Sequence, residues 1–351
     1  MRRRDRIDCA SDEISDLEAL RAYPWLRELR LRVASPHGSA EHALSDLSPL
    51  AELRELEVVE VPRSRVADLA PLAGLTGLRQ LDLSRTRARD LQPLTGLERL
   101  ASLRLARTPV QDLSPLRGLS ELAELDVAGT EVGSLEPLRG LTALRALDVR
   151  DSPVRDLSPV ADLPAVRDAH RIDLSGAQVE DLGALRSATA LEVLRLGGTR
   201  VRDLTPLSAL VTLRALSLAG TPVADLAPLA GLSGLMELNL SRTAVADLAP
   251  LSRLGVLEQL VLAETPVTNV RPLAGLGRLL ELQLQGTRVE DVQPLAWLTQ
   301  LQGLNLSRTP VRDVTPLATL GNLQWIDLSG TGVSRDSVTS LRRRRPDLQV
   351  L

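Results

Sequence analysis

The chain has almost no aromatic residues and no lysine. Its 351 residues include no Phe, one Tyr and three Trp. All 42 basic residues are Arg, which excludes lysine chemistry such as Schiff-base formation. Because hydrophobic residues still make up 44% of the chain, any core must be built mainly from Leu, Val and Ala.

Cysteine and histidine are also scarce. The single Cys9 excludes an internal disulfide framework and a cysteine-based zinc site. His37 and His42 flank Glu41 in a polar segment that a metal ion could use, although a flexible loop is the favoured interpretation. No glycine-rich phosphate loop follows a strand and opens a long helix. We therefore predict no catalytic residue, no metal and no cofactor, and expect the protein not to be an enzyme.

Long apolar runs and a strong net charge are missing as well. No apolar run approaches the roughly 18 residues of a membrane-spanning helix. The formal net charge of −3 gives no argument for binding nucleic acid or a membrane surface. Residues 2–4 are arginines, like the start of a signal peptide, but Asp5 and Asp8 follow them instead of an apolar stretch. The sequence thus predicts a cytoplasmic protein that binds neither membranes nor nucleic acids.

One motif of 22 residues recurs along nearly the whole chain. The copy that starts at Leu235 reads LMELNLSRTAVADLAPLSRLGV, with apolar residues at positions 1, 4, 6, 11, 14, 17 and 20. The fifteen copies start at Arg4, Leu26, Leu56, Leu78, Leu100, Leu122, Leu144, Ala169, Leu191, Leu213, Leu235, Leu257, Leu279, Leu301 and Leu323. The copy from Leu26 has eight extra residues within 35–43, and the copy from Leu144 has three near 166–168. This register predicts a single repeat domain over residues 1–351.

The first third of each repeat is typical of a short strand. Leu238 and Leu240 point to one side and Asn239 to the other, and strands of successive repeats are expected to stack in parallel. Position 9 is usually Thr, as in Thr243. We expect its hydroxyl to bond to the backbone of a neighbouring turn, which would make a ladder along the repeats.

The rest of each repeat is typical of a tight turn. Position 13 is usually Asp, which can accept hydrogen bonds from free N–H groups at a helix start. Position 16 is usually Pro, as in the pair Asp247 and Pro250, and proline is tolerated in a first turn. The pattern predicts an α/β repeat solenoid: a curved leucine-rich-repeat horseshoe with a parallel concave sheet and short 3₁₀ or single-turn helices on the convex side.

The motif L-x-x-L-x-L followed by V-x-D-L-x-P-L-x-x-L resembles the leucine-rich repeats of bacterial internalins. The resemblance covers nearly the whole chain, although Thr stands at position 9 where that family usually has Asn. It implies the solenoid fold and leaves a second functional hypothesis open, namely a secreted or surface protein of internalin type that adheres to host cells. The absence of a signal peptide or surface anchor favours the cytoplasmic alternative.

Both ends of a solenoid expose core and an open strand edge, so we expect caps. Residues 334–351 are interpreted as the C-terminal cap, with a helix over 337–344, a stop at Pro346 and a final strand with Leu348 and Val350. Residues 342–345 are all Arg. They either complete this helix, whose last turn favours cations, or form a separate basic cluster. The N-terminal edge is poorly protected, and we expect a monomer unless that edge pairs with another chain.

The outward strand positions are the ones that vary between repeats. We therefore predict that the concave face binds another protein, whose identity the sequence does not give. We expect an acidic patch to select the partner electrostatically and apolar anchors in the later half of the face to provide burial. The Asp126, Asp148 and Asp173 column is also the nearest approach to a catalytic carboxylate cluster. The candidate protein-binding residues are Glu124, Asp126, Asp148, Asp151, Asp173, Arg195, Met236, Glu237, Asn239, Val261, Leu280 and Trp325.

Overall fold

The computed structural model describes residues 5–11, 14–32, 41 and 43–351. The segment with His37 and His42 lies outside these residues. The chain divides into two compact units, which we call the N-terminal unit (Met1–Ala169) and the C-terminal unit (His170–Leu351). The boundary follows directly after the three-residue insertion found in the sequence. Whether the units act as one domain, as the unbroken register predicts, stays a prediction.

The N-terminal unit contains a seven-stranded parallel sheet in chain order. Its strands are β1 (Arg6–Ala10), β2 (Glu28–Arg32), β3 (Val58–Glu60), β4 (Gln80–Asp82), β5 (Ser102–Arg104), β6 (Glu124–Asp126) and β7 (Ala146–Asp148). A 3₁₀ helix follows each strand: η1 (Glu18–Ala22), η2 (Ser48–Leu50), η3 (Ala70–Leu72), η4 (Gln92–Leu94), η5 (Ser114–Leu116), η6 (Glu136–Leu138) and η7 (Ser158–Val160). The short helix α1 (Pro164–Arg167) occupies the three-residue insertion.

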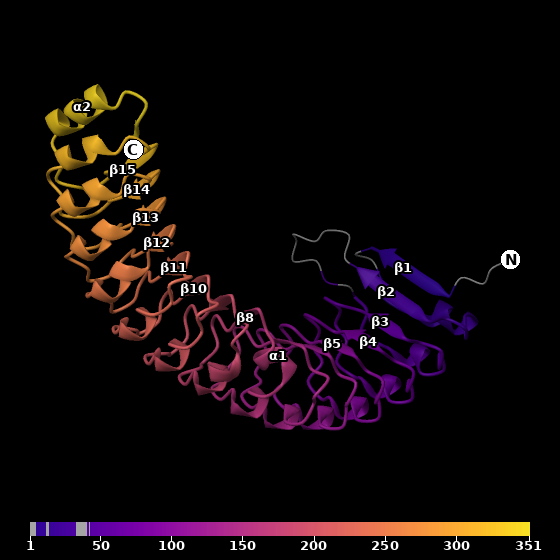
Figure 1. Ribbon diagram of the computed structural model, residues 1–351. Coiled ribbons are helices and arrows are strands. Elements are labelled where there is room, and N and C mark those ends of the chain that lie inside the picture. Colours follow the sequence, from indigo (N-terminus) through magenta and orange to yellow (C-terminus); the bar gives the residue numbers. More distant parts are fainter. Residues whose placement is uncertain (1–4, 12–13, 33–40, 42) are drawn as a thin grey trace. The chain divides into compact units, whose positions relative to one another are not determined.

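The C-terminal unit contains a nine-stranded parallel sheet. Its strands are β8 (Arg171–Asp173), β9 (Val193–Arg195), β10 (Ala215–Ser217), β11 (Glu237–Asn239), β12 (Gln259–Val261), β13 (Glu281–Gln283), β14 (Gly303–Asn305), β15 (Trp325–Asp327) and β16 (Gln349–Val350). The 3₁₀ helices are η8 (Gly183–Ser187), η9 (Thr205–Leu207), η10 (Ala227–Leu229), η11 (Ala249–Arg253), η12 (Arg271–Gly275), η13 (Gln293–Trp297) and η14 (Thr315–Thr319). The cap helix α2 (Arg335–Arg344) precedes β16. Within each unit, strands follow one side and 3₁₀ helices the other (Figure 1).

The leucine-rich-repeat fold predicted from the sequence is confirmed. Most strands pair with their counterparts 22 residues on, as Leu216 pairs with Leu238 and Leu238 with Leu260. In the repeat from Leu235, every predicted core position is at most 1% exposed: Leu235, Leu238, Leu240, Val245, Leu248, Leu251 and Leu254. Within each unit, the sheet and the 3₁₀ helices thus enclose an aliphatic core.

The position-13 aspartates hold the start of most 3₁₀ helices, and Ser134 and Asn269 take their place before η6 and η12. Asp247 Oδ1 accepts the backbone N–H of Ala249 at 2.8 Å, and Asp203 Oδ1 accepts that of Thr205 at 2.8 Å. Pro250 lies within η11, whose first turn needs no donor there. Where a hydroxyl follows, as at Thr205, its hydrogen bond and the backbone N–H lower the pKa of Asp203.

The position-9 hydroxyls do not form the expected ladder between repeats. Thr221 Oγ1 donates to the carbonyl of Leu218 at 2.6 Å, within its own repeat. That carbonyl also accepts the backbone N–H of Thr221 at 3.1 Å. The hydroxyl is buried, and the carbonyl of Leu218 lies three residues back, directly after β10. The local bond therefore satisfies both groups.

The ladder between repeats is instead made by the backbone at position 8. Arg85 N–H donates to Ala106 O, and Gly198 N–H to Ala219 O, each at 2.7 or 2.8 Å. Position 8 has positive φ in every repeat from Leu56 onward, which turns its N–H toward the next repeat. The residues are Arg63, Arg85, Arg107, Gly129, Asp151, Gly176, Gly198, Gly220, Arg242, Glu264, Gly286, Arg308 and Gly330.

The helix in the C-terminal segment begins slightly earlier than expected. Ser334 Oγ accepts the N–H of Ser337, so α2 starts at Arg335, not at residue 337. Leu341 of α2 and Leu348, just before β16, are buried. Arg345 of the arginine run donates to the carbonyl of Leu323 at 2.9 Å.

Candidate functional site

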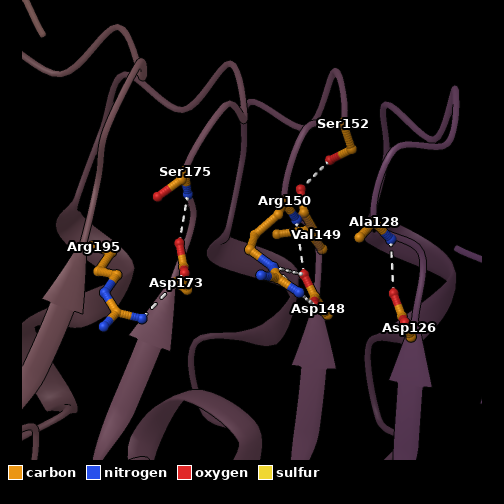
Figure 2. A network of polar contacts seen from close by, with 9 residues as sticks. All are labelled: Asp126, Ala128, Asp148, Val149, Arg150, Ser152, Asp173, Ser175 and Arg195. Carbon is orange, nitrogen blue, oxygen red and sulfur yellow. Dashed lines mark hydrogen bonds and ion pairs between the residues drawn. The ribbon is translucent and has the colours of Figure 1, made fainter. Parts of the chain in front are cut away.

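The candidate residues lie on or beside the outer faces of the two sheets. Position 5 is less free than the sequence suggested, because its Asp or Asn side chain holds the turn after the strand. Asn239 Oδ1 accepts the N–H of Ser241 at 2.9 Å and its hydroxyl at 2.7 Å. Asp126 Oδ1 accepts the N–H of Ala128 at 3.0 Å, as Figure 2 shows. These side chains therefore contribute to folding as well as to the surface.

Four candidates belong to the N-terminal unit. Asp126 and Asp148 are register partners on β6 and β7. Arg150 Nε donates to Asp148 Oδ1 at 2.9 Å, so much of the negative charge of Asp148 is neutralised (Figure 2). Glu124 accepts the Ser102 hydroxyl at 3.1 Å, and Asp151 lies in the left-handed turn after β7.

Asp126 is the candidate with the most perturbed electrostatics. Burial raises its pKa above the ordinary value, and the neighbouring carboxylates of Asp148 and Asp82 raise it further. The N–H of Ala128 and the charge of Arg150 oppose this change. The ionised carboxylate of half-buried Asp126 is thus destabilised, and a positively charged or hydrogen-bond-donating neighbour would stabilise it.

A groove of about 530 Å³ runs over β8–β12 of the C-terminal unit. Five predicted residues line it: Arg195, Met236, Glu237, Asn239 and Val261. The structure thus brings together candidates on or beside β9, β11 and β12, with β10 between β9 and β11. The other outward side chains that line the groove were not predicted: Arg171, Val193, Arg214, Ala215, Ser217 and Gln259.

The groove combines cationic and apolar surface. Arg195 forms an ion pair with Asp173 at 3.7 Å, which places the last acidic candidate beside the groove (Figure 2). Arg171 and Arg214 are exposed, and no ion pair with another described residue neutralises them. Met236 and Val261 are half-buried and offer apolar area. Guanidinium groups beside such area suit a peptide that carries both carboxylate and hydrophobic groups.

Leu280 and Trp325 lie on the same sheet but do not line this groove. Trp325 is half-buried and not freely exposed, because its ring lies over Gly303, where an added Cβ would be 2.5 Å from the indole. A hydrogen bond from Trp325 lowers the pKa of Glu281, but burial raises it more. The indole is therefore held in place on the sheet face.

One exposed aromatic was missed entirely. Trp297 ends η13 and is 70% exposed, on the side of the 3₁₀ helices. Its exposure could have been predicted from the sequence, because Trp297 occupies position 19 of its repeat, outside the seven core positions. Val211, at position 21, is 63% exposed for the same reason.

The described part of the chain has no group of three His, Cys, Asp or Glu residues arranged to hold a metal ion. Among the same residues, no helix has the length and apolarity needed to span a membrane.

Similar solved structures include bacterial leucine-rich-repeat proteins. An internalin (inlF) from Listeria monocytogenes is 28% identical with a TM-score of 0.74, and the match covers 82% of this chain and 84% of that one. A Leptospira interrogans leucine-rich-repeat protein is 18% identical with a TM-score of 0.81, over 98% and 95% of the two chains. The internalin-like character of the repeats is thereby confirmed.

A more distant match is the ectodomain of the Arabidopsis thaliana receptor kinase GASSHO1/SCHENGEN3, solved in complex with CASPARIAN STRIP INTEGRITY FACTOR 2. It is 18% identical with a TM-score of 0.70, and the match covers 96% of this chain and 48% of that one. At such identities the likeness shows the fold alone. No protein-family model matches the chain. No curated protein matches it either.

Proposed function

We propose that this chain is a non-catalytic protein-binding module whose groove over β8–β12 holds a segment of a partner protein. The observation that carries the proposal is the groove itself, where exposed guanidinium groups adjoin half-buried Met236 and Val261. Buried apolar anchors surrounded by polar groups are typical of binding surfaces on proteins. The plant ectodomain named above, which shares the fold, was solved with a protein ligand.

The partner segment is expected to be acidic and partly hydrophobic. Arg171 and Arg214 would pair with its carboxylates, while Met236 and Val261 would bury an apolar side chain. Glu237 opposes fully acidic ligands and therefore adds selectivity.

The test uses substitutions that other repeats already contain at the same position. Position 5 is Ser at Ser217 and Asn at Asn239, so Arg195→Ser and Val261→Asn should keep the fold. The control is Arg253→Ala on the exposed side of η11. Proteins captured from source cells by the wild-type chain would be identified and then titrated with each variant.

We expect the variant that combines Arg195→Ser with Val261→Asn to bind the partner about 30-fold or more weakly, which corresponds to loss of an anchor of about 2 kcal/mol. The control should bind like the wild type. Normal binding by the double variant, or equal weakening by Arg253→Ala, would show that the partner does not use the groove.

A second candidate is a secreted or surface protein that binds host cells, which the similarity to the Listeria internalin favours. The sequence favours the cytoplasm, and we propose that location. Fractionation of source cells, with protease treatment of intact cells, distinguishes the two. Digestion of the protein on intact cells would reject the cytoplasmic assignment and leave the groove proposal standing.

A further inference from the structure

Three consecutive repeats of the N-terminal unit place arginine at position 8, where the backbone is left-handed. Arg63, Arg85 and Arg107 have φ of 57°, 60° and 58°. Six other repeats have glycine at this position, which adopts such φ without steric cost. A side chain with a Cβ is disfavoured there. The backbone ladder needs only this conformation and not the side chain, so the ladder does not explain why arginine stands at Arg85 and Arg107.

The three arginines form a column of like charge. The backbone of each is joined to the next repeat by the position-8 ladder, and parallel strands lie about 4.8 Å apart. The positive charges of Arg63 and Arg107 lower the pKa of Arg85, after the larger contribution of its burial. Among the described residues, neither Arg85 nor Arg107 forms an ion pair, and both are exposed.

The C-terminal unit shows how the same position can be neutralised within the chain. Arg242 and Arg308 also occupy position 8, with Glu264 between them in the same column. Glu264 pairs with Arg242 at 2.9 Å and with Arg308 at 3.8 Å. Among the described residues, neither Arg85 nor Arg107 has such a carboxylate at position 8 of an adjacent repeat.

We propose that the column of Arg63, Arg85 and Arg107 is a second interaction surface, which binds an extended acidic segment of a partner protein. Guanidinium groups match carboxylates in a two-pronged geometry. Two intervals of about 4.8 Å span about 10 Å, the length of roughly three extended residues. Exposed Arg65 and Arg87, two residues beyond Arg63 and Arg85, extend the positive surface.

Nucleic acid fits the arginine column less well than an acidic protein segment does. Binding of single strands relies on aromatic stacking, and residues 56–121 contain no aromatic residue. Non-specific duplex binding relies on contacts to many phosphates. The column is short, and Asp68 and Asp90 lie exposed in the same repeats. A short carboxylate segment avoids the repulsion that a long polyanion would meet.

The test uses the full chain and a fluorescent peptide rich in Glu and Asp, compared with its Gln and Asn counterpart. The variant is Arg85→Gly with Arg107→Gly, which gives both sites the residue that six other repeats have. The matched control is Arg242→Gly with Arg308→Gly, which changes the same backbone position in the C-terminal unit. Fluorescence anisotropy gives affinity, and thermal unfolding reports the fold.

The wild-type chain should bind the acidic peptide at low salt, bind it more weakly as salt rises, and bind the amide peptide much less. The arginine variant should bind the acidic peptide about five- to tenfold more weakly, since each exposed ion pair contributes modestly. Its melting temperature should not fall, and the control should bind normally. Unchanged affinity of a folded arginine variant, or equal binding of both peptides, would overturn the proposal. Tighter arginine-dependent binding of single-stranded RNA would overturn the assignment to an acidic protein segment.

Discussion

The hydroxyl of Thr221 offers a direct test of how the repeats are held together. Its Oγ1 donates to Leu218 O at 2.6 Å, while the backbone N–H of Thr221 donates to the same carbonyl at 3.1 Å. In Thr221→Val the carbonyl keeps its backbone partner, so no buried acceptor is left unsatisfied. The lost hydrogen bond costs about 0.5–1.5 kcal/mol. The added methyl group offsets up to about 0.8 kcal/mol.

Thr221→Ala should cost more than Thr221→Val, because it also removes a buried methyl group. We expect about 1.5–2.5 kcal/mol for the alanine variant. Alanine is compatible with the turn, since Ala177 stands at position 9 of its own repeat and keeps the backbone bond to Leu174 O. Urea denaturation followed by circular dichroism measures both variants, provided the dependence on denaturant is unchanged.

A double-mutant cycle distinguishes a local bond from a ladder. Thr243 lies one repeat on, and its hydroxyl bonds to Leu240 O within its own repeat at 2.7 Å. The effects of Thr221→Val and Thr243→Val should therefore add to within about 0.5 kcal/mol. A coupling energy of about 1 kcal/mol or more would mean that the hydroxyls communicate between repeats and that the local assignment is wrong.

Further predictions concern the strands and the carboxylates. Leu240→Ala should lower the free energy of unfolding by about 2–5 kcal/mol in urea titrations, because Leu240 is fully buried. Asn239→Ala should cost about 0.5–1.5 kcal/mol through loss of its bonds to the next turn, whereas Asn239→Asp should be nearly neutral; equal stability of Asn239→Ala and wild type would refute the turn-holding role. Asp126→Asn should raise the melting temperature at pH 7. This gain should vanish at acidic pH, because the raised pKa of Asp126 means that the folded protein already favours the neutral acid there. Asp112 and Asp203 have lowered folded-state pKa values, so their contribution is present above the unfolded pKa of about 3.9 and is lost as pH falls below it. Thermal unfolding from pH 7 to pH 3 should show this loss in the wild type and a smaller one in Asp112→Asn with Asp203→Asn.

The repeat register could be predicted because each feature of it has a local cause. Alternation of apolar residues fixes which side of a strand is buried, as at Leu238 and Leu240. Asp and Pro at fixed distance mark the start of most 3₁₀ helices, as at Asp247 and Pro250. These signals act over a few residues and recur in most of the repeats, so chance agreement is excluded.

The details of the surface could not be predicted, because they depend on groups that are distant in sequence or ambiguous in role. An Asp or Asn at position 5 reads as a free surface residue, yet the structure shows that Asn239 holds its own turn. The sequence suggests an exposed anchor at Trp325. Gly303, 22 residues earlier, has no side chain there, so the indole packs over it on the sheet face. The groove needs outward groups from β8–β12 together, and the arginines Arg171 and Arg214 have no distinctive local pattern.

Position 8 separates what the fold requires from what it merely permits. The fold requires a left-handed residue there, because the N–H must reach the carbonyl of the next repeat, as Gly198 N–H reaches Ala219 O. Glycine adopts this conformation without steric cost. A charged residue in its place is therefore retained for another reason, or its steric cost is offset by other contacts. For Arg242, the ion pair with Glu264 supplies an offset within the chain. Arg85 and Arg107 have no such pair among the described residues, so their offset is expected from outside the chain. If the acidic peptide binds and the Arg85→Gly, Arg107→Gly variant is both more stable and binding-deficient, the strain at these two residues is explained by recognition.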